Sequence, residues 1–436
     1  MSNLNIKLHE RELAGAPVRN AVIGVGMMGT GIVDTMTNME GMSASFVADV
    51  SSERAKIALL AAGIKEADIV VTDDPGAADN AIAAGKHVAS GCAHLAPELA
   101  NIDVITDSTG VPEVGADMAF RSITAKKHFV MMTVETDICI GPLLKRMADS
   151  AGVVYTGASG DEPAATMELI NFARAMGLQV VAAGKGKNTP WHPDANPDNI
   201  TELVPKFKNI KNVNWHMICE FVDGSKTAIE MSAIANAAGL LPDVRGMHGP
   251  DATRDNLHKV FTSKERGGVL TNTTDVIEYC IGISPGVFCV VRGTYPAAKE
   301  SFASFNKDGN GDDLYPLYRP YHLTSLETPL SAAKAVLLGE SSIAPIGMYC
   351  EVITRAKKDL APGEKIDRIG GYCVLGSMDN AEICRQENLL PLSLAQNSTV
   401  KRAVKKGEFL TYDDVELPEN STIVQLRSMQ DKLLYE

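Results

Sequence analysis

The stretch RNAVIGVGMMGTG, residues 19–31, decides the fold of the first part of the chain. A short apolar strand runs into Gly24-x-Gly26-x-x-Gly29. In such a loop the first glycine permits a tight turn, the second lets a pyrophosphate approach the backbone, and the third lets a helix pack on the strand. The helix that starts there points its N–H groups at the phosphates. The pattern predicts a dinucleotide site that also includes Met27 and Met28.

A second predicted strand, SASFVAD, ends at Asp49, which lies 20 residues past Gly29. An acidic residue at this distance holds the ribose diol of NAD and repels the 2′-phosphate of NADP. Arg54 follows closely, together with two serines, and could bind that phosphate instead. The alternative for Arg54 is a solvated helix residue. These residues leave the choice between NAD and NADP open.

The chain as a whole has the composition of a soluble globular protein, and its length suggests two or three domains. It has 436 residues, of which 45% are hydrophobic and 22% charged, and a formal net charge of −13. This charge makes nucleic acid and anionic membranes poor partners. The N-terminus has no apolar signal segment, and we expect no membrane-spanning segment. Eight cysteines without a CxxC pair predict reduced thiols and a cytoplasmic location.

Strand and helix patterns alternate up to about residue 157. Apolar strands separated by helices predict a doubly wound parallel sheet, so the fold class is α/β with a Rossmann domain over 17–157. A helix over 326–339 is predicted to complete it. Residues 158–343 predict an α+β catalytic and dimerisation domain, and 344–436 a small β-rich domain. Within the middle domain we expect strands at 178–186, 212–224 and 286–295.

Ligands of such sheets bind at the carboxyl ends of the strands. Ser108, Thr109 and Gly110 close one strand on the side expected for the nicotinamide, and small polar residues there suit the cofactor. An ordinary helix-capping turn is the alternative, since serine and threonine cap helices well. The loop at 134–137 follows the next strand and is expected at the same edge.

Lys226 and Glu230 are spaced four apart on a predicted helix that is otherwise almost uncharged. This spacing puts both on one face, where a lysine and a carboxylate could handle a proton at a reacting oxygen. A surface ion pair is the alternative, and it is common. The remainder of the helix is apolar, which indicates that the helix is buried. Because burying charged groups is costly, this favours a catalytic role for the pair.

Lys185 and Lys187 follow an apolar run among glycines, a pattern that suits an anion site as well as a plain basic turn. His248 and Arg319 are further candidates for substrate or phosphate binding. Asp161 and Glu162 could join Glu230 around a divalent cation. They could equally be acids at a helix N-terminus, which the helix dipole favours.

The chain resembles the homoserine dehydrogenase architecture, and more closely its deoxyxylulose 5-phosphate reductoisomerase-like offshoot. The resemblance covers nearly the whole chain and rests on GVGMMGTG, MMTVETD, GKGKNTPWHPD, DGSKTAIEMSAIANAAGL and YRPYHL, with a tail similar to a SAF-type domain. Two departures from homoserine dehydrogenase stand out. The loop at 134–137 lacks that family's lysine, and the acid–lysine order of its catalytic helix is reversed in Lys226 and Glu230.

The resemblance implies an NADPH-dependent reductoisomerase, with NADH possible, that converts 1-deoxy-D-xylulose 5-phosphate to 2-C-methyl-D-erythritol 4-phosphate for isoprenoid synthesis. Lys226, Glu230 and Lys185 would then be catalytic, and Lys187 would bind the phosphate. Asp49 fits NADPH less well. One alternative is an oxidoreductase acting on an unphosphorylated hydroxy acid or alcohol; another is a non-catalytic dinucleotide sensor. The expected partners are a small-molecule substrate and a second copy in a homodimer.

Overall fold

The computed structural model describes residues 3–189, 191–205, 214–305 and 313–435. Its contacts divide the chain into two units. Unit 1 comprises Met1–Ala164, Leu323–Ala344 and Gln425–Glu436, and unit 2 comprises Ala165–His322 and Pro345–Val424. Among the described residues, no helix combines the length and the apolar character needed to cross a membrane.

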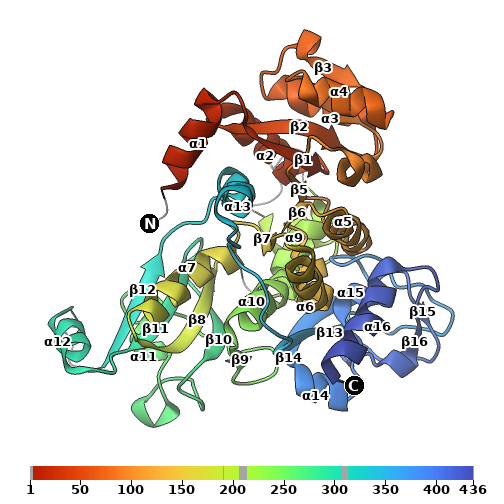
Figure 1. Cartoon of the computed structure of the whole chain (residues 1–436). Coiled ribbons are helices and arrows are strands. Elements are labelled where there is room, and N and C mark those ends of the chain that lie inside the picture. Colours follow the sequence, from red (N-terminus) through yellow and green to blue (C-terminus); the bar gives the residue numbers. More distant parts are fainter. Residues whose placement is uncertain (1–2, 190, 206–213, 306–312, 436) are drawn as a thin grey trace. The chain divides into compact units, whose positions relative to one another are not determined.

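Unit 1 is built on a seven-stranded sheet in the order β3-β4-β2-β1-β5-β6-β7, and every neighbouring pair is parallel (Figure 1). This is the doubly wound α/β fold that the alternating pattern predicts. The strand order reverses between β1 and β5, which is where such sheets bind ligands. The strands are β1 (Val18–Ile23), β2 (Met42–Ala48), β3 (Ile69–Val71), β4 (His87–Ser90), β5 (Val104–Asp107), β6 (His128–Met131) and β7 (Tyr155–Gly157).

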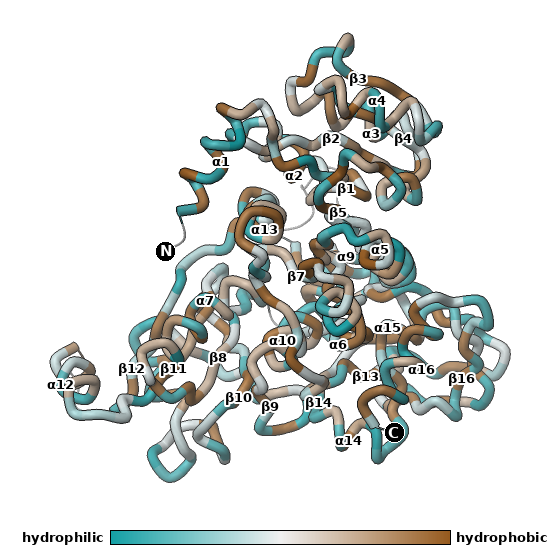
Figure 2. Tube along the Cα trace, viewed as in Figure 1, coloured by the Kyte–Doolittle hydropathy of each residue, from teal (hydrophilic) through white to brown (hydrophobic). Residues whose placement is uncertain are grey.

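Helices connect successive strands of this sheet, as parallel pairing requires. They are α2 (Met27–Asn38), α3 (Ser52–Ala61), α4 (Pro75–Ala83), α5 (Pro112–Thr124) and α6 (Val134–Ala151), preceded by α1 (Leu4–Leu13). Apolar residues run through the strands (brown in Figure 2), and those of β1, β2 and α2 belong to one core with residues of α1, α3 and α13.

Two distant segments complete unit 1. Helix α13 (Thr324–Leu338) packs against α2 and the central strands, and its buried Ala332 and Ala333 belong to the same core. Close packing requires Gly31, where a Cβ atom would lie 2.8 Å from Ser325. The end of α16 (Thr422–Tyr435) is the second segment.

Unit 2 contains a mixed five-stranded sheet in the order β12-β11-β8-β10-β9. Its central strand β8 is parallel to β10 and antiparallel to β11. Helix α7 (Glu162–Ala175) leads into this unit. The strands are β8 (Gln179–Lys187), β9 (Leu241–Pro242), β10 (Val276–Ile281), β11 (Val287–Arg292) and β12 (Leu314–Arg319). The shorter helices around them are α8 (Ile200–Leu203), α11 (Leu257–Val260) and α12 (Pro296–Phe305).

Helix α10 (Ser225–Ala238) is buried along almost its whole length, because it lies between the mixed sheet and the tail. It contacts β8 and β10, and also β13 (Cys350–Ala356) and β14 (Val374–Asn380), an antiparallel pair. A helix covered in this way must be uncharged except where charge has a partner. The tail also contains α14 (Ala381–Gln386), α15 (Leu392–Ala395), β15 (Thr399–Val400) and β16 (Val415–Glu416).

The structure corrects some predicted elements. The strand expected at 212–224 is helix α9 (Trp215–Asp223), whose buried Ile218, Cys219 and Val222 recur at helical spacing, and Asn214 caps it. Helix α1 and strand β4 were not predicted. All eight cysteines are free, as expected from the absence of CxxC pairs.

Candidate functional site

The glycine loop joins β1 to α2, and two of its glycines are required by the protein itself. Gly24 has φ +88°, which L side chains rarely adopt. A Cβ atom on Gly29 would lie 1.9 Å from the carbonyl oxygen of Gly24, so only glycine lets α2 start this close to β1. Both glycines therefore shape the loop.

Gly26 is different, because no internal contact explains it. Its φ is −70°, and a Cβ atom there would have no protein atom within 4 Å. The residue is exposed at the N-terminus of α2, next to the exposed Met27. A helix N-terminus with open space in front of it suits a phosphate group. The loop therefore fits a dinucleotide pyrophosphate.

Asp49 directly follows β2, and its carboxylate is already engaged. Its two oxygens accept hydrogen bonds from the backbone N–H groups of Val25 and Val50, both at 2.9 Å. Arg54 lies 3.1 Å from one of them. Asp49 thus holds the glycine loop, and the Arg54 charge is directed at Asp49. Both residues lie where the adenosine ribose is expected, and their pairing weakens the case for a 2′-phosphate ligand.

Asp73 is a second acid at this edge that was not picked out from the sequence. Its carboxylate accepts hydrogen bonds from the Ser90 hydroxyl at 2.6 Å and the Gly91 N–H at 2.9 Å, and the Ser90 bond holds its pKa below the ordinary value. Gly91 faces the first N–H of α3, since a Cβ atom there would lie 3.6 Å from the nitrogen of Ser52. The sequence feature that could have identified Asp73 is its position two residues after β3.

Ser108, Thr109 and Gly110 follow β5 and are tied to the protein. The Ser108 hydroxyl lies 2.8 Å from the Gly24 carbonyl, and Thr109 donates to the buried Asp107 at 2.7 Å. The Gly110 N–H donates to the Thr133 hydroxyl at 3.0 Å. These residues brace the carboxyl edge of the sheet, and their contact with a cofactor stays a prediction.

Residues 134–137 form the first turn of α6 rather than a loop, and their side chains are buried. Asp137 accepts a hydrogen bond from the Tyr155 hydroxyl at 2.7 Å. Burial raises the pKa of Asp137 to about 6, and the Tyr155 bond opposes this rise. Desolvation likewise raises the pKa of Asp107. The carboxyl edge of the sheet thus holds two buried acids, Asp107 and Asp137, whose raised pKa values depend on burial that the sequence does not show.

In unit 2, Glu230 lies between two lysines. The side chain of Glu230 is 1% exposed and forms an ion pair with Lys185, which is 6% exposed. Lys226, one turn earlier on α10, lies 3.9 Å from the other Glu230 oxygen and is more accessible, at 15%. The structure therefore brings together all three predicted catalytic residues, and Lys185 is the closer partner.

Lys185 and Lys187 lie in β8 itself, so the structure does not support the basic turn that was the alternative to an anion site. Pairing places Arg319, Val287, Lys185 and Tyr279 in one row across β12, β11, β8 and β10. Residues paired in register point to the same face, so Arg319 and Lys185 share a face with one strand between them. The Lys187 ammonium donates to the Phe221 carbonyl, and Arg319 lies 2.9 Å from Glu168.

His248 belongs to a different cluster. Its ring lies 2.7 Å from Glu278, whose carboxylate also accepts the His248 backbone N–H at 2.8 Å, and 3.6 Å from Asp243. Burial raises the pKa of Glu278, although these hydrogen bonds oppose it. The segment that carries His248 also lies against Tyr279 of the Lys185 row, since a Cβ atom on Gly249 would lie 2.2 Å from the Tyr279 hydroxyl oxygen.

The candidate metal ligands are divided between the units. Asp161 and Glu162 lie at the end of unit 1, and Glu230 lies in unit 2. Because the three residues belong to different units, the divalent-cation site stays a prediction.

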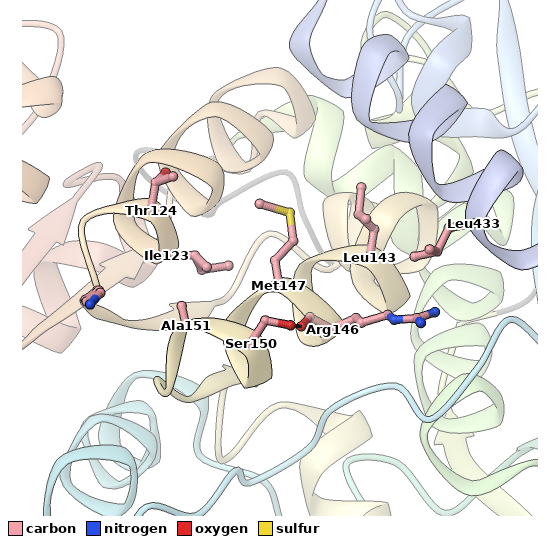
Figure 3. Close-up of a pocket in the computed structure, with 9 residues that line it drawn as sticks. Ile123, Thr124, Leu143, Arg146, Met147, Ser150, Ala151 and Leu433 are labelled. Carbon is pink, nitrogen blue, oxygen red and sulfur yellow. Dashed lines mark hydrogen bonds between the residues drawn. The ribbon is translucent and has the colours of Figure 1, made fainter.

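A surface pocket of about 420 Å³ in unit 1 is not the cofactor site (Figure 3). It lies at the C-terminal ends of α5 and α6, and parallel strands place these ends opposite the glycine loop. Its lining is Ile123, Thr124, Lys126, Leu143, Arg146, Met147, Ser150, Ala151 and Leu433.

Comparison with known proteins gives one family match. Residues 160–328 match the family described as "Oxidoreductase DRL, catalytic domain". A comparison with curated protein sequences finds no match.

Similar solved structures include a "probable dehydrogenase" from Thermotoga maritima, with 13% identity over 74% of this chain and 90% of that one, and a TM-score of 0.42. A UDP-N-acetylglucosamine 3-dehydrogenase from Acidithiobacillus ferrooxidans has 11% identity over 75% and 92%, with a TM-score of 0.37. An oxidoreductase from Agrobacterium radiobacter, in complex with NAD⁺, L-tartaric acid and magnesium, has 10% identity over 47% and 53%, with a TM-score of 0.28.

The matched range contains Lys185, Lys187, Lys226, Glu230, His248 and Arg319. The chain therefore combines a glycine-loop domain that fits a nicotinamide dinucleotide with a segment similar to an oxidoreductase catalytic domain.

Proposed function

We propose that the protein is an NAD(P)H-dependent reductoisomerase that acts on a phosphorylated hydroxy-ketone, with 1-deoxy-D-xylulose 5-phosphate as substrate and 2-C-methyl-D-erythritol 4-phosphate as product. The observation that carries the proposal is the buried Glu230 between Lys185 and Lys226. Hydride chemistry at a carbonyl needs a proton at its oxygen, and this trio can supply it. A bound dinucleotide would supply the hydride.

Within the trio the roles follow from exposure. Lys226 is the most accessible group, so it donates or accepts the proton at the substrate oxygen. Glu230 faces both ammonium groups and orients Lys226. Lys185 neutralises Glu230 in the interior, where an unpaired carboxylate would be costly. Arg319, in register with Lys185 with one strand between them, and Lys187, two residues along β8, are further cations for a substrate phosphate.

The first experiment measures dinucleotide binding by isothermal titration calorimetry with NADH and NADPH. We expect the wild type to bind one of them and Gly26→Val to lose binding without losing stability, because the new side chain enters open space. Gly76→Val, at the first turn of α4, is the matched control and should bind normally. Absence of binding of both nucleotides to the wild type would exclude the proposal.

The second experiment follows nucleotide oxidation at 340 nm with a panel of sugar phosphates and their unphosphorylated analogues. Deoxyxylulose 5-phosphate should be turned over, and Lys187→Met should raise KM for the phosphorylated substrate alone. Equal activity with and without the phosphate would exclude the phosphorylated substrate.

An unphosphorylated hydroxy acid or alcohol is the second candidate. It is favoured by the contacts of Lys187 with the Phe221 carbonyl and of Arg319 with Glu168, which already engage both cations. If this candidate is correct, the unphosphorylated members of the panel should react and Lys187→Met should leave their KM unchanged.

Further proposals concern conditions and assembly. EDTA tests for a divalent-cation requirement, which would appear as a loss of turnover that Mg²⁺ or Mn²⁺ restores. We also propose a cytoplasmic homodimer, which light scattering should show as twice the 46.5 kDa chain mass.

A further inference from the structure

Helix α6 carries a weak point in its middle. It has 18 residues, and Pro142 lies inside it after Gly141. Proline and glycine are the two poorest helix-forming residues. Relative to alanine, proline destabilises a helix by about 3 kcal/mol and glycine by about 1 kcal/mol. Proline also lacks an N–H donor, and its ring clashes with the carbonyl four residues earlier. The turn around Pro142 therefore needs support from outside the helix.

Gln430 of α16 provides this support. Its side-chain nitrogen donates to the Cys139 carbonyl at 2.9 Å, and its side-chain oxygen accepts the Leu143 N–H at 3.0 Å. In a regular helix the Leu143 N–H would donate to the Cys139 carbonyl four residues earlier. Here the Gln430 carboxamide bonds to both groups. Gln430 is fully buried, so these bonds are made away from water. A helix-like hydrogen-bond pattern is thus bridged by a residue 287 positions away along the chain.

Arg427, one turn earlier on α16, reinforces the same point. Its guanidinium lies 3.3 Å from the Cys139 carbonyl and 2.8 Å from Asp431. The next turn of α16 also meets α6, because Leu433 and Leu143 both line the pocket in Figure 3. Two hydrogen-bonding side chains and an apolar contact therefore hold α16 along the Pro142 turn.

The turn around Pro142 follows the first turns of α6, which lie at the carboxyl edge of the sheet where the dinucleotide is expected. The first turn of α6 contains Glu135 and Asp137, and the preceding Thr133 accepts the N–H of Gly110. Any tilt of α6 before Pro142 would move these groups. We propose that Gln430 is a positioning residue of the dinucleotide domain, which holds the first turns of α6 in place across the Pro142 break. This inference rests on the proposed function.

The test is a double-mutant cycle between positions 430 and 142. Gln430→Met keeps the size of the side chain and removes both hydrogen bonds. Pro142→Ala restores the missing N–H donor and helix propensity, so α6 no longer needs the bridge. Gln430→Glu keeps an acceptor for Leu143 and removes the donor to Cys139. Met429→Ala, at an exposed position on the same helix, is the matched control.

We expect Gln430→Met to lower kcat/KM by on the order of a hundredfold, as small misplacements of a reacting edge do. It should also weaken dinucleotide binding in calorimetry and speed hydrogen exchange at the Leu143 amide. Pro142→Ala should recover much of all three losses in the double variant. Gln430→Glu should fall between wild type and Gln430→Met, and Met429→Ala should match wild type.

The inference is overturned if Gln430→Met lowers the melting temperature but leaves kcat/KM and dinucleotide affinity unchanged, since the residue would then be structural only. It is also overturned if Gln430→Met does not fold and Gln430→Glu, once folded, binds and turns over as wild type. Failure of the proposed function is distinguishable, because the wild type itself would then bind neither nucleotide.

Discussion

Glu230 is the residue on which the chemistry of unit 2 depends, because it is buried and faces two ammonium groups. Removing one member of a buried ion pair leaves the other charge uncompensated, which costs about 3–5 kcal/mol. Without Glu230 the buried Lys185 would lose this ion pair in the interior, whereas Lys226 is the more accessible of the two lysines, at 15% exposed. We therefore expect the loss of Glu230 to destabilise the surroundings of Lys185 more than those of Lys226.

We predict that Lys226→Ala lowers kcat by about 10²–10⁴-fold, the usual worth of general acid–base assistance, with dinucleotide affinity unchanged. Lys226→Arg should not restore turnover, because a guanidinium keeps its proton. Steady-state kinetics and calorimetry on the same preparations measure both. A near-normal kcat in Lys226→Ala would refute the catalytic role.

Glu230→Gln should instead reduce both turnover and stability, because it removes the ion pair between Glu230 and the buried Lys185. We expect its melting temperature to fall well below that of Lys226→Ala, as measured by calorimetric scanning. Equal melting temperatures of the two variants would show that the Lys185 pair contributes little to folding.

Asp137 should make stability depend on pH in unit 1. Its folded pKa is about 6, raised from 3.8 by burial, so the folded protein binds this proton more tightly than the unfolded chain. The stabilisation is complete below about pH 4 and is lost as the pH rises through about 6. Asp137→Asn should remove this dependence and stabilise the protein at pH 7.5 by on the order of 3 kcal/mol. Urea unfolding at pH 4.5 and 7.5 tests this, with the exposed Asp149→Asn as control.

Residue roles were predictable to the extent that they depend on local spacing. The i, i+4 relation of Lys226 and Glu230 and their place on an uncharged helix can be read directly from the chain. The pairing of Lys185 with Glu230 cannot, because it depends on how β8 packs against α10. Asp73 and Gln430 carried no motif for the same reason, since their partners are distant in sequence. Asp137 lies in the motif MMTVETD, but its hydrogen bond with Tyr155 could not be predicted from the sequence.

Elements with a strong pattern were predicted well, and those with a weak one were not. The glycine loop, its strand and its helix follow from three glycines with separate physical roles. The sequence predicts a strand where helix α9 lies, because its run of apolar residues is too short to distinguish the helical period from the strand period. Strand β4 has only four residues and no flanking signal strong enough to reveal it.

The glycine loop gives a prediction at the scale of the element. Gly29→Ala should destabilise unit 1, because its Cβ atom would lie 1.9 Å from the Gly24 carbonyl and α2 would have to move away from β1. Gly26→Ala meets no such contact and should melt as wild type does. Thermal unfolding of the two variants measures the difference. Equal melting temperatures would mean that the close approach of α2 is not needed.

At the scale of the whole molecule, the α/β class and the mixed second sheet follow from the order of the patterns. The chain's repeated passage between the units does not, except for the helix expected at 326–339, which corresponds to α13. The end of α16 gave no sign that it belongs with the first residues, because an amphipathic helix shows that it is covered but not by which partner.

The two-unit arrangement predicts an uneven response to nucleotide. A ligand that binds only the folded form stabilises it by about 2.7 kcal/mol at a hundred times its dissociation constant. We expect a saturating dinucleotide to raise the melting of unit 1 in calorimetric scans, and Gly26→Val to abolish the shift. A shift of the same size in Gly26→Val would place nucleotide binding elsewhere.

The late position of helix α13 in the sequence also affects how unit 1 can fold during synthesis. The ribosome releases the seven strands of the first sheet early, but the helix that covers α2 and the central strands is encoded after all of Ala165–His322. At ordinary elongation rates that delay is on the order of tens of seconds. During it, the nascent sheet presents the apolar surface later covered by Ala332 and Ala333. We therefore expect a fragment of the first 164 residues to expose this apolar surface and to aggregate more readily than the whole chain.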